Sequence, residues 1–147
     1  MTFSLLEAAR VFVGSLLLLV AVPSLCAADS LTVSPTHLFI SAPATQTTLT
    51  VRAKGRRPAF LQIRVMRWRK GTDPRAISPT QDVVASPPFA RLLPRQELTV
   101  RVVRVARQPL HAPKCYRVLV DLLPGPEQNG HAVRLLIRQS IPLCFTN

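Results

Sequence analysis

The side chains that could do chemistry in this chain are few and lie far apart. The three histidines are His37, His111 and His131, and each lies in or beside a loop-like segment. None has a metal-ligand spacing or a nucleophile elbow around it. Cys115 and Cys144 form no Cys-x-x-Cys pair, which favours a disulfide over a zinc or redox site. The sequence therefore predicts no enzyme, no cofactor and no metal site.

The segment between these two cysteines carries a hairpin signal. Asn129-Gly130 is the preferred pair for a two-residue turn, because both residues tolerate positive φ. If they are the central turn residues, Cys115 lies directly opposite Cys144, at the separation that a cross-strand disulfide needs. The same register places Asp121 opposite Arg138, an opposite-charge pair. The alternative is a wider loop that shifts the pairing.

The strand after this turn has an unusual apolar row. All but one of its odd-numbered positions are apolar, and the row is Val133, Leu135, Ile137, Gln139, Ile141, Leu143 and Phe145. The lower three could meet a core, whereas the upper three lie beyond most of the predicted core. Two explanations stay open. The row is either ordinary sandwich core or an edge meant to pair with another chain, since proteins otherwise avoid an exposed apolar edge.

A β-rich framework must position these residues, and the rest of the chain predicts one. From Leu31 on, no stretch has a helical period, while short β-rich runs recur between Pro, Gly and Asp or Asn. The predicted strands are 31–40, 46–54, 59–69, 83–85 with 89–93, 96–106, 115–123 and 132–145. The expected fold is all-β, a seven-stranded immunoglobulin-like β-sandwich.

Alternation within the runs predicts which faces are buried. The expected core positions are Leu61, Ile63 and Val65 in the third strand and Leu98, Val100 and Val102 in the fifth. Pro142 lies inside the last strand, although proline cannot donate to a ladder. It predicts that this strand is at an edge or leaves one side unpaired near that point.

Residues 1–28 have the layout of a cleavable export signal, with small residues leading to Ala28 as the expected cleavage site. The apolar run 11–22 is shorter than the roughly 20 residues of a spanning helix, so no stable membrane insertion is expected. Cys26 leaves with the signal. Residues 29–147 are then one domain with two cysteines, which an oxidising compartment allows to pair.

The charge predicts acidic partners. The chain has 19 Lys and Arg against 7 Asp and Glu, a formal net charge of +12, which attracts polyanions, anionic lipid and acidic protein surfaces. Nucleic acid is the least accessible of these outside the cytoplasm, and none is expected as a partner. One hypothesis is therefore a small basic exported domain that binds polyanions or the membrane surface.

Five stretches, in this order, are similar to one known family: SPTHLFI, LQIRVMRW, ASPPFARLLPRQELTVRV, YRVLVDLLP and VRLLIRQSIPLCF. The span from Leu31 to Phe145 resembles the N-terminal domain of periplasmic pilus-assembly chaperones, the PapD-like family, most closely its archaic Csu-type branch. The resemblance implies a periplasmic chaperone whose partners are pilus subunits and an outer-membrane usher.

The resemblance also implies a binding device. In this family the last strand lends alternating apolar side chains to a subunit that lacks its own final strand. By position, the lent residues would be Val133, Leu135 and Ile137, which favours the second explanation of the apolar row. The family anchors the subunit's terminal carboxylate with basic residues. His37 stands at its arginine position and is the candidate anchor, although a neutral imidazole is a weaker carboxylate partner than a guanidinium.

The resemblance stops short of the whole family architecture. Family members continue into a second β-sandwich, whereas this sequence stops at Asn147, where the linker would begin. We therefore expect a truncated or split gene product, or a one-domain variant, located in the periplasm after cleavage near Ala28.

Overall fold

The computed structural model describes residues 30–125 and 136–147, and within them the chain forms ten β-strands. The strands are β1 (Leu31–Ser34), β2 (Leu38–Ser41), β3 (Gln46–Ala53), β4 (Ala59–Trp68), β5 (Ile77–Pro79), β6 (Val83–Ser86), β7 (Phe89–Leu92), β8 (Glu97–Arg104), β9 (Lys114–Leu123) and β10 (Arg138–Thr146). The predicted export signal and the Asn129-Gly130 turn lie outside the described residues. Within those residues, no helix is long and apolar enough to cross a membrane.

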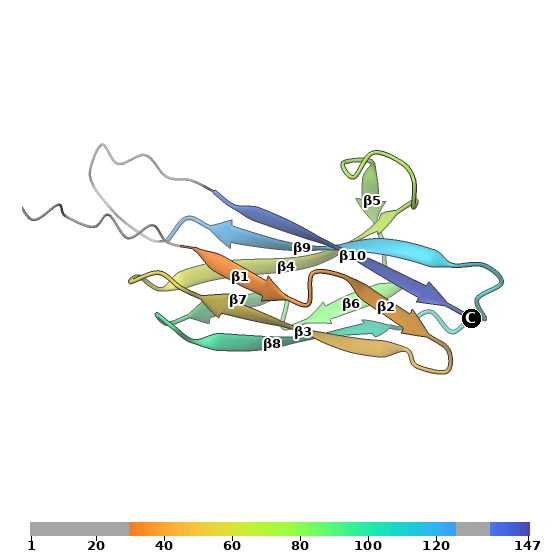
Figure 1. Cartoon of the computed structure of the whole chain (residues 1–147), viewed down its shortest axis with the longest axis horizontal. Helices are drawn as coiled ribbons and strands as arrows, with labels where there is room; N and C mark the ends of the chain where they lie inside the picture. Colours follow the sequence, from red (N-terminus) through yellow and green to blue (C-terminus); the bar gives the residue numbers. More distant parts are fainter. Residues whose placement is uncertain (1–29, 126–135) are drawn as a thin grey trace, which may run out of the picture.

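The strands form two sheets that pack face to face (Figure 1). One sheet has the order β1-β3-β8-β6, and the other has the order β2-β10-β9-β4-β5, with β7 also paired to β4. Over the described ranges every ladder is antiparallel except that between β2 and β10. The predicted all-β, immunoglobulin-like sandwich is confirmed, and its seven predicted runs correspond to ten observed strands.

The extra strands arise mainly because two predicted runs cross from one sheet to the other. The run 31–40 divides around Pro35, so that β1 pairs with β3 while β2 pairs with β10. The run predicted as 83–85 with 89–93 is interrupted at Pro87 and Pro88, and its two parts join different sheets: β6 pairs with β8 while β7 pairs with β4. Proline has no amide hydrogen to donate, and the ladder ends there. Strand β5, which was not predicted, is only three residues long and shows too little alternation to be recognised.

The core lies between the two sheets and contains the predicted faces. Leu61, Ile63 and Val65 of β4 and Val100 and Val102 of β8 are buried, and Leu98 is half-buried beside them. Strands β9 and β10 add Tyr116, Val118, Val120, Ile141, Leu143 and Phe145. At one end of the sandwich, the Tyr116 hydroxyl donates to Oδ2 of Asp82 at 3.2 Å, and this oxygen also accepts from Arg67 at 2.8 Å. A polar contact thus joins the two sheets where the core ends.

Candidate functional site

The candidate site is built on the neighbouring antiparallel strands β9 and β10. Their register places Arg138 opposite Asp121 and Cys144 opposite Cys115, which is the pairing that a two-residue turn at Asn129-Gly130 predicts. The two cysteines form a disulfide, and their Cα atoms are 4.1 Å apart. Strand β10 is therefore tied to β9 by a ladder and by a covalent bond.

On its other side, β10 is paired over only part of its length. Strand β2 runs parallel to it and pairs with residues 143–146. In the described part of the chain, residues 138–142 have no strand partner on that side. Pro142 is the last residue before the β2 ladder begins. This agrees with the expectation that the strand leaves one side unpaired near Pro142.

The backbone of this unpaired stretch points outward. The short Cα distance between Cys115 and Cys144 is typical of a non-hydrogen-bonded pair, in which the backbone N–H and C=O groups turn away from the partner strand. Residues at even positions of β10 share this orientation, because the ladder to β9 has no interruption. Arg138 and Ser140 are at even positions, so their backbone groups face away from β9 toward the open side, and both residues are exposed. The result is a short free edge at the start of β10.

The odd-numbered row of β10 begins in the core and ends at this edge. Its lower members, Ile141, Leu143 and Phe145, are buried. Gln139, the polar member, donates from Nε2 to the carbonyl of Leu31 in β1 at 2.9 Å. This bond links the two sheets at the start of β10, with the buried members of the row on one side of it along the strand and Ile137 on the other. Val133 and Leu135 are outside the described residues.

Ile137 is the first residue of the upper row. Its carbonyl accepts a hydrogen bond from the amide of Leu122 at 2.9 Å, which extends the pairing with β9 by one residue beyond Arg138. The Ile137 side chain is half-buried, whereas its neighbour Leu136 is 66% exposed. Because successive side chains of an extended chain point to opposite faces, these two residues present different faces of the same edge.

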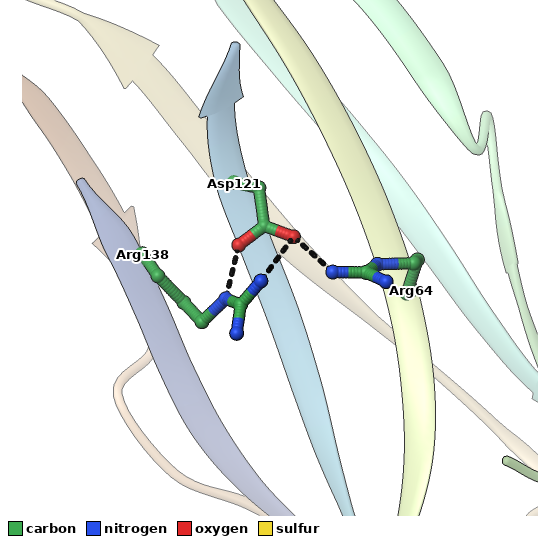
Figure 2. A network of polar contacts seen from close by, with 3 residues as sticks. All are labelled: Arg64, Asp121 and Arg138. Atoms are coloured by element: carbon green, nitrogen blue, oxygen red, sulfur yellow. Dashed lines mark hydrogen bonds and ion pairs between the residues drawn. The ribbon is translucent and has the colours of Figure 1, made fainter. Parts of the chain in front are cut away.

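A buried carboxylate lies on the outer face of the sheet beside this edge. Asp121 is the one buried polar or charged side chain among residues 30–125 and 136–147, with 7% exposure. Its Oδ1 accepts from Nε of Arg138, and its Oδ2 accepts from Nη2 of Arg64 at 2.7 Å (Figure 2). Burial raises the pKa of Asp121, but the hydrogen bonds from the two guanidinium groups outweigh it and hold the pKa below its ordinary value. The expected Asp121–Arg138 pair is present, and Arg64 of β4 is a third member that the sequence did not reveal.

His37 lies beside β10, at the end of the free edge where Pro142 stands. It is exposed and directly precedes β2, and its Nδ1 lies 3.1 Å from Oγ1 of Thr36. Because Leu38 pairs with Leu143, His37 stands at the level of Pro142. The structure thus brings the candidate anchor to the unpaired side of β10, next to the point where the two strands meet.

Comparison with known families identifies the chain. Residues 30–146 match the family model described as pili and flagellar-assembly chaperone, PapD N-terminal domain. The chain belongs to this family. The match covers nearly all of the predicted domain 29–147, and PapD-like proteins are a family of chaperones rather than of enzymes. No curated protein matches the chain in sequence.

Solved structures agree with the PapD-like assignment. A chain of the CsuC–CsuE chaperone–tip adhesion subunit pre-assembly complex, from archaic Csu pili of Acinetobacter baumannii, is 24% identical with a TM-score of 0.66, over 80% of this chain and 56% of that one. A chain of the Salmonella enterica complex between SafA pilin and the SafB chaperone is 25% identical, with a TM-score of 0.66, over 81% and 55%. The E. coli chaperone DraB is 24% identical with a TM-score of 0.62, over 80% and 55%. The chain therefore spans about half the length of the solved chains that it matches.

The PapD-like fold places the described candidate residues along β10. Ile137 directly precedes the free edge of β10, His37 stands at the level of Pro142 at the other end of that edge, and Cys144 of the disulfide follows two residues later. The described residues contain no cluster of three or more His, Cys, Asp or Glu side chains that could hold a metal ion. This arrangement offers a partner the strand edge at residues 138–142 and the side chain of Ile137.

Proposed function

We propose that this PapD-like domain is a periplasmic chaperone for pilus subunits and that it acts by donor-strand complementation. The observation that carries the proposal is the free edge of β10, where residues 138–142 are paired on one side only. A subunit that lacks a strand can add its own edge to this one. The exposed backbone groups of Arg138 and Ser140 would then supply hydrogen bonds to the subunit.

Side-chain specificity comes from the upper apolar row. Ile137 is the described member, and Val133 and Leu135 continue the row in the sequence with the same alternation. Complete burial of an aliphatic side chain of this size contributes roughly 1.5–3 kcal/mol relative to exposure. Three such residues in the pockets of a subunit, together with the ladder, give an affinity that neither interaction reaches alone.

The remaining assignments follow from the same model of function. His37 is proposed to hydrogen-bond the terminal carboxylate of the subunit, because it stands beside Pro142 at the end of the free edge. Residues 1–28 are proposed to direct export with cleavage near Ala28. An outer-membrane usher is proposed to receive the loaded subunit, which requires the complex to form in the periplasm.

Neighbouring residues of opposite orientation provide the test. The chain is co-expressed with a pilus subunit that lacks its own final strand, and protection of the subunit from protease is measured. Ile137→Asp should abolish protection, because a carboxylate cannot enter an apolar pocket. Leu136→Asp is the matched control, since Leu136 is 66% exposed and lies on the other face, and it should retain protection.

The same pair of variants separates this function from polyanion binding. A domain that binds polyanions through its +12 charge would bind heparin, lose it with added salt, and be indifferent to both substitutions. Full protection of the subunit by Ile137→Asp would refute donor-strand complementation. Salt-sensitive heparin binding in that case would favour the polyanion function instead.

A further inference from the structure

We infer that Asp121 is a positioning residue for the free edge of β10. By bonding Arg138, it fixes the place where the pairing of β10 with β9 begins. The role of the Asp121–Arg138 contact in subunit binding rests on the proposed function, whereas its geometry does not. The relevant contacts are the two carboxylate–guanidinium interactions on the outer face of the sheet and the hydrogen bonds next to them along the strand.

The carboxylate joins three strands of the sheet, with Arg138 directly opposite Asp121 and Arg64 two residues off the opposite position on β4. Asp121 is on β9, Arg138 lies directly opposite it on β10, and Arg64 comes from β4 on the other side. Figure 2 shows the two guanidinium groups approaching the carboxylate from opposite sides, each bonded to it. Both carboxylate oxygens are occupied, and each arginine contacts the group from its own strand. Asp121 therefore ties β10 to the interior of the sheet.

The Asp121–Arg138 contact lies at the first residue of the free edge of β10. Arg138 is the first residue of β10, and the next bond along the chain is that between the amide of Leu122 and the carbonyl of Ile137. On the inner face, Gln139 is held by the carbonyl of Leu31. Two neighbouring residues are thus fixed on opposite faces, immediately after Ile137, the side chain that we propose to enter the subunit.

The Cys115–Cys144 disulfide fixes the register of β10 at Cys144. The contacts of Arg138 and Gln139 oppose a local shift or fraying of the stretch between that bond and Ile137. A shift by one residue would exchange the inner and outer faces and expose the core row. A shift by two residues would keep the faces but would move Arg138 away from Asp121 and Gln139 away from Leu31. The register that presents Ile137 above the core is therefore the one in which both contacts form.

A buried carboxylate is better explained by register than by stability. Fixing a register is the best-attested role of a buried ion pair, since well-packed apolar residues of similar volume often give equal or greater stability. Here the Asp121 side chain is 10% exposed and that of Arg138 is 57% exposed, so an apolar pair could cover the same surface. An apolar pair would have no fixed partner geometry and would not hold the start of β10 in one position on β9.

The test compares two arginines that contact the same carboxylate. Amide hydrogen exchange is measured by NMR on the exported chain and on two variants, Arg138→Met and Arg64→Met, which keep the apolar stem of each side chain. The exchange rate of the Leu122 amide reports opening of its hydrogen bond to the Ile137 carbonyl. The exchange rate of the Val100 amide, in the other sheet, reports global opening. Arg138→Met should speed exchange at Leu122 about tenfold relative to Val100, and Arg64→Met should change this ratio less than about twofold.

Every outcome decides the proposal. Equal acceleration at both amides in Arg138→Met would show a merely stabilising pair and would overturn the inference, as would an unchanged Leu122 amide. A selective effect of the same size in Arg64→Met would also overturn it, because Arg64 does not lie on β10. Asp121→Asn is a second variant that should match Arg138→Met. These measurements use the free chain, so they can fail while subunit protection succeeds, and the reverse.

Discussion

Reduction of the Cys115–Cys144 disulfide should lower the free energy of unfolding by about 3–4 kcal/mol. The two cysteines are 29 residues apart in sequence. The chain-entropy relation for a closed loop of that length gives about 3.6 kcal/mol at 25 °C, because the crosslink restricts the unfolded chain. Reduction leaves the same side chains in the same positions. The loss therefore measures the crosslink alone.

The assay is urea unfolding of the purified chain, with and without a phosphine reductant. The reduced chain should unfold at lower urea and with a larger dependence on urea, because its unfolded state is no longer held compact and exposes more surface. A Cys115→Ala, Cys144→Ala double variant is the control, and the reductant should leave its unfolding curve unchanged.

Two results would refute the reasoning. If reduction changes the free energy of unfolding by less than about 0.5 kcal/mol, the bond between β9 and β10 does not restrict the unfolded chain as the loop length predicts. If the free energy falls but the urea dependence stays the same, the lost stability belongs to the native state, and the entropic explanation is wrong.

Three further predictions concern the core, a titrating residue and a turn. Leu143→Ala, at a fully buried position, should cost about 2–5 kcal/mol in urea unfolding, while Leu136→Ala, at a position 66% exposed, should cost less than about 0.5 kcal/mol; similar losses would contradict the placement of the two faces of the chain. Burial and the Asp82 carboxylate raise the pKa of Tyr116 from 10.0 to about 12. The resulting roughly 3 kcal/mol of stability should be complete below pH 10 and lost as the pH rises through 12, and a Tyr116→Phe variant should show no such loss in unfolding measured against pH. Arg95 has a φ of 64° in the turn that the Gln96 amide closes on the Leu93 carbonyl; Arg95→Gly should therefore raise the stability by about 1 kcal/mol in a thermal melt, and a lower melting temperature would count against this turn.

The sequence contains a signal for a sheet crossing within a run, which is a change in the parity of its apolar positions. In the first run the buried residues are Leu31 and Val33, at odd positions, and then Leu38 and Ile40, at even positions. A strand cannot change the parity of its buried face without a break, because successive side chains alternate. The change of parity around Pro35 therefore marks a passage to the opposite sheet, and it was readable beforehand.

The hairpin register was predictable because it depends on local arithmetic from a single turn. It gave the pairing of Asp121 with Arg138, but not the contact with Arg64, which comes from a strand on the far side of β9. No local rule reports which distant strand lies next to a hairpin, or how the residues across it align. The free edge was indicated by Pro142, whereas its extent depends on where β2 begins to pair.

The two crossings also determine how this domain can come apart. Since the chain enters the opposite sheet after β1 and again after β6, neither sheet can be assembled from a continuous stretch of sequence. Separating the sheets would tear both crossing segments from their ladders, so the sandwich should fold and unfold as one cooperative unit. A partner that docks on the start of β10 would then bind to a sheet that cannot separate from the other sheet without unfolding the domain.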